Sequence, residues 1–219
     1  MKFWWVNQNQ TLKHEITGGY MWSPKTKANG DRNRFYDYMT EVEVGDVVFS
    51  FADTKISFIG IAAGKAYSSS KPNEFDDNDS WSNDGWLTPV EFYELQSPIR
   101  PKSHIQAIRS YLPNKYSPLQ DNGNGNQGVY LTEVPAELAE ALSNLLGSQV
   151  QDTIKRHTAE EFSHIEIDSV DVKAVKEIRL RKDIEETEKL RLVKSRNGQG
   201  LYKDRVKEIE LGCRVTGLS

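Results

Sequence analysis

The chain lacks the cysteines that a disulfide or a structural zinc site needs. Cys213 is the single cysteine among 219 residues. One thiol cannot form an internal disulfide, and without a second cysteine nearby a zinc site is not expected. Such scarcity is typical of proteins in a reducing compartment, so we expect a cytoplasmic protein.

Long apolar runs are also missing. Hydrophobic residues make up 37% of the chain and the mean hydropathy is -0.65. No stretch approaches the roughly 20 apolar residues of a membrane-spanning helix. Lys2 is followed by aromatic residues and amides, which does not resemble a signal peptide. We therefore expect no membrane association. The length of the chain suits one domain of about 150 residues plus a smaller part.

The chain has no excess of positive charge, since its formal net charge is -4. The acidity lies in the middle third: residues 76–150 contain 4 Lys and Arg against 10 Asp and Glu, whereas residues 1–75 contain 9 against 8. Four basic residues follow the aromatic N-terminal segment, and they could contact phosphates: Lys25, Lys27, Arg32 and Arg34. A solvated basic loop would have the same composition.

Aromatic residues and amides are concentrated at the start of the chain. Residues 3–11 (FWWVNQNQT) begin a predicted strand over 2–9, and residues 18–24 (GGYMWSP) form a second aromatic group. Alternation places Phe3 and Trp5 on one face of the strand, and Trp4 and Val6 on the other. Three tryptophans within 22 residues, next to amides, favour a stacking and hydrogen-bonding pocket over simple core packing.

The remaining pattern predicts an α+β protein. We expect a long irregular loop over 10–34, a short helix over 33–39, a hairpin of strands 47–51 and 56–62, and a polar loop over 68–86. A strand over 87–95, helices over 101–112 and 135–146, and a short strand over 129–131 follow. From about residue 150 aromatic residues become rare, and residues 169–194 have the pattern of a charged helix that serves as a spacer or docking arm.

Catalytic patterns are not found in residues 1–150. The glycine- and asparagine-rich residues 122–128 (NGNGNQG) are not followed by the lysine of a phosphate-binding loop. No nucleophile and base form a recognisable pair either. An enzyme is therefore the least expected function of this part.

Several motifs carry a resemblance to a known family. The chain resembles the modification-dependent restriction endonucleases that join an EVE domain to an HNH nuclease. The resemblance rests on residues 3–11 and 18–24, and on further short segments: 35–36 (FY), 44–46 (VGD), 50–51 (SF), 59–60 (IG), 71–75 (KPNEF), 85–86 (GW), 116–120 (YSPLQ) and 129–131 (VYL). Residues 198–217 resemble the beginning of an HNH domain.

The resemblance implies a fold and a domain order. Residues 1–150 would form an EVE domain, a PUA-like bent β-barrel flanked by helices. Residues 151–197 would form a helical linker, and residues 198–219 would begin the HNH domain. The catalytic histidines of that family follow this point, so this chain is expected to bind without cutting. It would need no cofactor, whereas the HNH part would need a divalent metal.

The resemblance also implies a ligand, double-stranded DNA that contains 5-methylcytosine or 5-hydroxymethylcytosine. The modified base would be flipped into an aromatic pocket. The expected pocket walls are Pro24, Trp81 and Tyr130, with Trp86 as the alternative to Trp81 and with Trp22 and Ser23 beside Pro24. Asn7, Ser50 and, less strongly, Asp53 would read the base edge, and Lys25, Lys27, Arg32 and Arg34 would hold the DNA backbone.

Two other functions remain open at this level. A PUA-like barrel could read modified RNA instead of DNA, or the tryptophan pocket could bind a protein. The choice between methyl and hydroxymethyl groups, the flanking-sequence preference and the oligomeric state are open as well.

Overall fold

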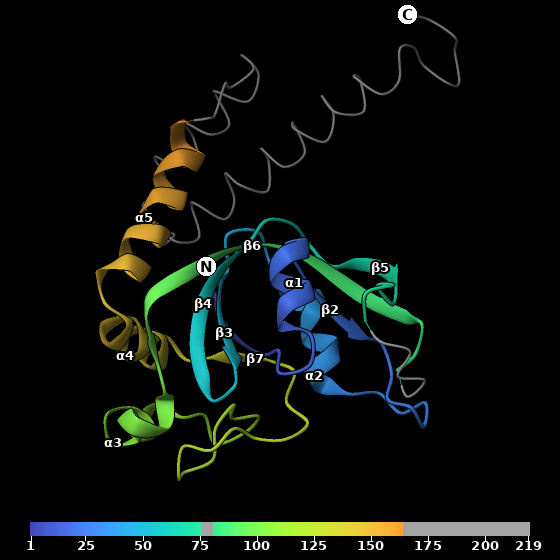
Figure 1. Cartoon of the computed structure of the whole chain (residues 1–219), viewed down its shortest axis with the longest axis horizontal. Helices are drawn as coiled ribbons and strands as arrows, with labels where there is room; N and C mark the ends of the chain where they lie inside the picture. Colours follow the sequence, from blue (N-terminus) through green and yellow to red (C-terminus); the bar gives the residue numbers. More distant parts are fainter. Residues whose placement is uncertain (76–80, 164–219) are drawn as a thin grey trace, which may run out of the picture. The chain divides into compact units, whose positions relative to one another are not determined.

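The computed structural model describes residues 1–75 and 81–163. Its compact unit, Met1–Ala159, is a bent mixed sheet with helices around it (Figure 1). This confirms the predicted α+β class, with the small bent sheet and flanking helices expected of a PUA-like domain. The predicted charged helix (169–194) and HNH start (198–219) lie outside the described residues. In the part that is described, no helix has the length and apolar character to cross a membrane.

The sheet has seven strands in the order β2-β6-β4-β3-β1-β7, with β5 paired to β6. β1 and β3 are parallel, and the other neighbours are antiparallel. The strands are β1 (Phe3–Asn7), β2 (Tyr20–Pro24), β3 (Val47–Ala52), β4 (Lys55–Ala62), β5 (Tyr67–Ser70), β6 (Asp84–Ile99) and β7 (Leu131–Val134).

The helical elements are short except for the last two. They are α1 (Leu12–Gly18), α2 (Arg34–Asp37), η1 (Tyr38–Glu41), η2 (Pro101–His104), α3 (Ile105–Ile108), η3 (Arg109–Tyr111), α4 (Ala136–Leu146) and α5 (Ser148–Ser163). Helix α5 runs across the predicted boundary at residue 150.

Strand β6 gives the sheet its bend. Its second half, from Val90 to Ile99, pairs with β4, and its first half pairs with β2 and β5. The register with β4 also shifts between Ile56 and Phe58, and such irregularities increase strand bending. The β2–β6 ribbon therefore extends away from the main sheet (Figure 1).

Strand β1 separates the two main hydrophobic clusters, as its alternation predicts. Trp5 packs with Phe49 and with α4, whereas Trp4 and Val6 pack with Met39 on the other face. Trp4 and Trp5 are fully buried, so both are core residues and neither lines an open pocket. The prediction that the three N-terminal tryptophans form a stacking pocket is therefore wrong for Trp4 and Trp5.

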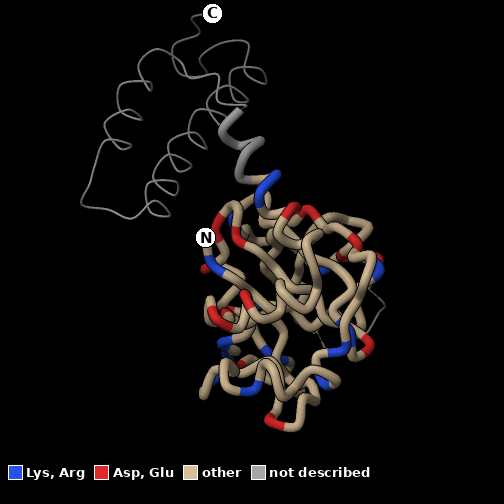
Figure 2. Tube along the Cα trace, turned by 90° about the vertical axis from the view of Figure 1, so that its left-hand side faces the viewer, with Lys and Arg blue, Asp and Glu red and all other residues tan. Residues whose placement is uncertain are grey.

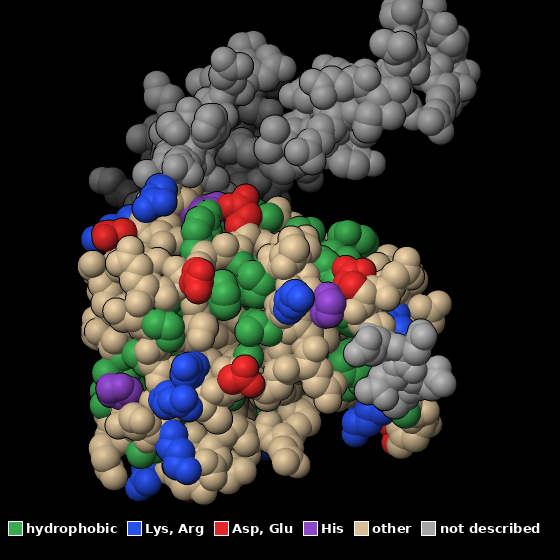
Figure 3. All heavy atoms as spheres, viewed as in Figure 1, with side chains coloured by type: hydrophobic (Ala, Val, Ile, Leu, Met, Phe, Trp, Pro, Cys, Tyr) green, Lys and Arg blue, Asp and Glu red, His purple; other side chains and the backbone are tan. Residues whose placement is uncertain are grey.

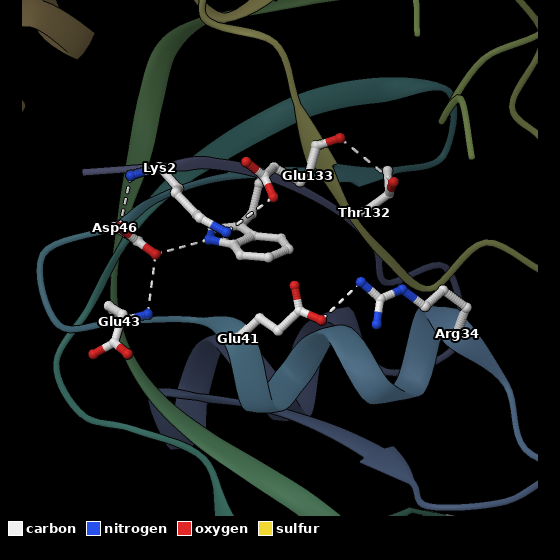
Figure 4. Close-up of polar contacts among 8 residues, drawn as sticks. Lys2, Arg34, Glu41, Glu43, Asp46, Thr132 and Glu133 are labelled. Atoms are coloured by element: carbon white, nitrogen blue, oxygen red, sulfur yellow. Dashed lines mark hydrogen bonds and ion pairs between the residues drawn. The ribbon is translucent and has the colours of Figure 1, made fainter. Parts of the chain in front are cut away.

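Buried Asp46 fixes the start of β1 against the start of β3. Its Oδ1 accepts a hydrogen bond from the Lys2 backbone N–H at 2.7 Å, and its Oδ2 accepts from Trp4 Nε1 and from the Glu43 backbone N–H, both at 3.0 Å. Figure 4 shows these bonds converging on one carboxylate. The 44–46 turn therefore connects the start of β1 to the start of β3 in addition to changing the chain direction.

Several local predictions are confirmed. The β3–β4 hairpin turns at Asp53 and Thr54, both in the left-handed region (φ 48° and 66°), as a two-residue hairpin turn requires. Helix α4 lies within one residue of its predicted bounds. The predicted helix over 33–39 is present as α2 followed by η1.

Three predictions are wrong in part. Residues 10–34 are not one irregular loop, because α1 and β2 lie within them; Gly18 ends α1 and Gly19, at φ 67°, caps it. Residues 68–86 contain β5 and the start of β6 rather than only a polar loop. Residues 101–112 form three short helical segments instead of one helix.

Candidate nucleic-acid interface

The β2–β6 ribbon divides the predicted pocket residues between two faces. Trp22 is paired with Leu87, Ser23 with Trp86, and Pro24 with Gly85. Because side chains alternate along a strand, Trp22 and Pro24 share one face, whereas Ser23 shares the opposite face with Trp86.

The first face carries an aromatic cluster, which we call the Trp22 cluster: Tyr20, Trp22 and Phe75, with Trp81 and Leu87 packed against them. The ring centroids of Trp22 and Trp81 are 6.3 Å apart with an interplanar angle of 34°. Phe75 lies edge-on to both indoles, at 5.6 Å from Trp22 and 6.0 Å from Trp81. Trp22 is 1% exposed, so the cluster is closed in this structure, and Trp81 is its half-buried outer member.

One polar atom in this cluster has no partner. The buried Trp22 Nε1–H makes no hydrogen bond within the described part of the chain. An unpaired buried donor destabilises a protein by about 1–3 kcal/mol, so such atoms are rare without a functional reason or a bound molecule. The indole lies directly on Gly85, where any Cβ would overlap the Trp22 ring.

The opposite face has its own polar features. Lys25 Nζ lies 4.4 Å from the ring centroid of Trp86 and forms an ion pair with Asp84 at 2.7 Å. Two buried hydroxyls on this face, those of Ser23 and Thr88, have no hydrogen-bond partner in the described structure. Lys25 is thus held over an aromatic ring at the end of β2.

Tyr130 belongs to a buried network beneath β2. Glu15 Oε1 accepts hydrogen bonds from the Tyr130 hydroxyl at 2.7 Å and from the Trp22 backbone N–H at 2.8 Å. Glu15 Oε2 accepts from Gln8 Nε2 at 2.5 Å, and Gln8 Oε1 accepts from the Ser50 hydroxyl at 2.5 Å. The network joins α1, β2 and β3 with the residue after β1, Gln8, and the residue before β7, Tyr130.

Burial controls the electrostatics of this network. It raises the pKa of Glu15 to about 7, although the hydrogen bonds from Tyr130, Trp22 and Gln8 act in the opposite direction. The pKa of Tyr130 is raised well above its ordinary value, first by burial and then by the Glu15 carboxylate. Glu15 was not among the residues that the sequence suggested, because its burial depends on segments distant in sequence.

The structure does not bring all predicted pocket residues together. The Tyr130 ring packs against the cluster that contains Met21, on the face opposite Trp22, so Tyr130 and Trp81 do not face each other across β2. The Asn7 side chain is occupied by other contacts: its Oδ1 accepts a hydrogen bond from Trp5 Nε1, and its Nδ2 donates to the Val129 carbonyl oxygen. Ser50 points into the Glu15 network, and Asp53 lies in the exposed β3–β4 turn.

The predicted backbone contacts lie on the segment that leaves the Trp22 cluster. Lys27 and Arg32 are exposed on the loop after β2, and Arg34 begins α2, where it pairs with Glu41 at 2.7 Å (Figure 4). Lys and Arg gather toward the lower end of the domain, and Asp and Glu are more frequent toward its upper end (Figure 2). Figure 3 shows further basic side chains near α3, where Arg100, Lys102 and Arg109 are exposed.

A separate surface hollow of about 410 Å³ lies between the C-terminal end of α1 and β6. None of the predicted pocket residues lines it; its lining is Ile16, Thr17, Gly18, Gly19, Ala63, Val90, Glu91, Phe92 and Tyr93. Within residues 1–75 and 81–163, no group of three or more His, Cys, Asp or Glu side chains is arranged to hold a metal ion. The Trp22 cluster itself offers aromatic ring surfaces and one unpaired hydrogen-bond donor, Trp22 Nε1–H.

No family model and no curated protein matches the chain. Solved structures that are similar to it include human THYN1 in complex with DNA containing 5-methylcytosine, at 15% identity and a TM-score of 0.42, covering 67% of this chain and 98% of that one. A structural-genomics protein from Pseudomonas putida is 13% identical, with a TM-score of 0.44 and coverage of 66% and 99%.

The YTH domain of Zygosaccharomyces rouxii MRB1, in complex with N6-methyladenosine RNA, is a third similar structure. It is 9% identical, with a TM-score of 0.42 and coverage of 66% of this chain and 86% of that domain. Similarity at this level assigns neither a family nor a ligand to this chain.

Proposed function

We propose that this domain reads a modified base in a nucleic acid, and that the base binds in the Trp22 cluster. The observation that carries the proposal is the neighbouring pair of indoles, Trp22 and Trp81, tilted by 34° to each other, with the unpaired Trp22 Nε1–H at the edge of the inner ring. Pro24 lies on the same face of β2 and offers an apolar wall for a methyl group.

A base can lie between the two indoles only if the Trp22 cluster opens. Optimal contacts between stacked carbon atoms are about 3.5 Å, so a base between two rings needs planes about 7 Å apart. In the closed cluster the ring centroids are 6.3 Å apart and the rings are tilted by 34°, so one ring must move and turn to receive a base. Because Trp22 is held on Gly85 while Trp81 is half-buried, we expect Trp81 to move when a base enters.

The unpaired indole donor adds a polar requirement. A carbonyl or phosphate oxygen of a nucleotide at the ring edge would accept its hydrogen bond and remove the cost of the buried, unpaired group. Stacking contributes about 1–3 kcal/mol per base, comparable to the few kcal/mol that extrusion of a base costs. Base flipping is therefore energetically feasible at this site.

The charges next to the cluster suit a phosphate backbone. Lys25 follows Pro24 directly and lies over Trp86 on the opposite face of the ribbon, and Lys27 and Arg32 are exposed on the loop after it. A nucleic acid with a base held by Trp22 would have its phosphates run along this segment. Lys25 is already fixed over Trp86 by Asp84, which reduces the entropy lost on binding.

Our first choice of ligand is double-stranded DNA with 5-methylcytosine or 5-hydroxymethylcytosine, and modified RNA is the second. The DNA assignment, and the further proposal that the chain is the sensor of a modification-dependent restriction endonuclease, rest on the sequence resemblance described above. The HNH-like residues 198–219 lie outside the described structure.

The test is a binding titration with labelled oligonucleotides. Matched duplexes with unmodified, methylated and hydroxymethylated cytosine, and RNA with and without N6-methyladenosine, would be compared by fluorescence anisotropy. We expect the tightest binding to a duplex with modified cytosine. Equal affinity for modified and unmodified forms of every probe would refute the proposal.

A variant of Trp81 tests whether the Trp22 cluster is responsible for the preference for modified DNA. Trp81→Ala should lose about fivefold or more of its affinity for modified DNA, the lower end of base–aromatic stacking, while Trp81→Phe keeps most of it. Tyr111→Ala is the control, since Tyr111 is 42% exposed and is not part of the cluster. An unchanged preference in folded Trp81→Ala would place the base elsewhere.

A further inference from the structure

Tyr116 has a backbone conformation that large side chains seldom adopt. Its φ is 59°, in the left-handed region, and it is not a glycine or an asparagine. Its carbonyl oxygen accepts a hydrogen bond from the Thr132 hydroxyl at 2.8 Å, which ties the loop to β7. The side chain is nevertheless 46% exposed. Strained conformations held by surrounding contacts are concentrated at functional sites.

The Tyr116 ring is held in place by two other aromatic rings. Phe35 lies edge-to-face with it at 5.7 Å and 89°, and Tyr38 does so at 6.1 Å and 83°. The Arg34 guanidinium lies 4.2 Å from the Tyr38 ring centroid and is itself fixed by Glu41. The result is a supported aromatic surface with cationic groups beside it, Arg34 and the exposed Lys115.

The chain connects this surface to the proposed base site. The strand that carries Trp22 ends at Pro24, the basic loop follows, and α2 begins at Arg34 next to Phe35. Phe35 and Tyr38 pack with the cluster that contains Met21, so the Tyr116 surface lies on the other side of β2 from Trp22. The loop that carries Lys25, Lys27 and Arg32 connects the two sides.

We propose that Tyr116 stacks on a second, unpaired nucleobase of the nucleic acid that the Trp22 cluster reads. Extruding one base leaves its partner or a neighbour unstacked, and an exposed ring of fixed orientation replaces the lost stacking at low entropic cost. Because every base has a π-face, this contact strengthens binding without distinguishing modified from unmodified cytosine. The inference rests on the proposed function, which assigns the ligand.

The test uses the full chain and the same labelled duplexes, unmodified and methylated. Tyr116→Asn removes the ring and keeps a residue type that tolerates the left-handed region. It should weaken binding to both duplexes by about fivefold or more and leave their affinity ratio unchanged, because base–aromatic stacking is lost at either duplex. Tyr116→Phe should bind like the wild type. Tyr111→Asn, which removes a similarly exposed tyrosine, should have no effect.

The outcomes separate the two proposals. A wild-type chain without any preference for modification refutes the proposed function. If the wild type prefers the methylated duplex but Tyr116→Asn binds both duplexes within twofold of the wild-type affinity, only the Tyr116 contact is refuted. If thermal unfolding shows that Tyr116→Asn is not folded, Tyr116→Leu takes its place, because leucine keeps apolar packing against Phe35 and Tyr38 without a stacking ring. Tyr116→Leu binding like the wild type would overturn the inference.

Discussion

Glu15 makes the stability of this domain depend on pH in an unusual direction. The side chain is completely buried and accepts hydrogen bonds from Tyr130, Trp22 and Gln8. Burial raises its pKa from an ordinary 4.5 to about 7. We therefore choose Glu15→Gln as the informative change, because glutamine keeps the size and one carbonyl oxygen while it removes the titration.

The sign follows from proton binding. Between pH 4.5 and 7 the folded protein retains a proton on Glu15 that the unfolded chain has lost, so stability falls as pH rises through this window. Below the window both states are protonated, and above it the loss is complete. The shift corresponds to about 3 kcal/mol at most. Glu74 and Glu91 have lowered pKa values, so their contributions change below pH 4.5 and leave the window clear.

Glutamine at position 15 can satisfy the network. Its carbonyl oxygen would accept from the Tyr130 hydroxyl and the Trp22 N–H, and its amide would donate to Gln8 if the Gln8 amide turned over and donated to Ser50. The two forms of Gln8 have nearly the same shape, so the change costs little. The protonated carboxyl of the wild type would use the same arrangement.

The assay is urea denaturation of both proteins at several pH values from 4.5 to 8. The free energy of unfolding of Glu15→Gln minus that of the wild type should increase across the range, by up to about 3 kcal/mol. The slope m should stay the same in both proteins, since the same surface is exposed on unfolding. A difference that stays flat from pH 4.5 to 8 would show that Glu15 is not protonated in the folded state at neutral pH.

Two further predictions test the joint between β1 and β3 and the packing of the Trp22 cluster. Asp46→Asn should lower the free energy of unfolding by about 3 kcal/mol, because the new amide faces N–H donors from Trp4 and Glu43. The control is Asp121→Asn, at an exposed position, which should change the free energy of unfolding little. Equal urea midpoints for the two variants would contradict the role of Asp46. Gly85→Ala should destabilise the domain by about 1–3 kcal/mol and weaken the preference for modified cytosine, because a Cβ there overlaps the Trp22 ring and lies 2.7 Å from the Ser23 carbonyl oxygen. Gly125→Ala, whose Cβ would meet only the Phe51 ring at 3.3 Å, is its control, and wild-type stability of Gly85→Ala would be the contrary result.

Local pattern was sufficient where neighbours in sequence determine the structure. The alternation of residues 3–8 predicted which tryptophan faces which cluster, and the hairpin turn at Asp53 and Thr54 was visible between two apolar runs. In the segment 10–34 the signals for α1 were present, since Gly19 is a typical helix cap, but we interpreted the two glycines as loop breaks.

The candidate site required the tertiary structure because its parts come from distant segments. The sequence alone showed that Trp22, Pro24 and Trp81 were candidates, and it placed the basic loop directly after them. The pairing of β2 with β6 then placed Trp22 and Ser23 on opposite faces, and it separated Tyr130 from Trp81. The burial of Glu15 depends on Tyr130, a residue 115 positions away, and no local pattern contains such a contact.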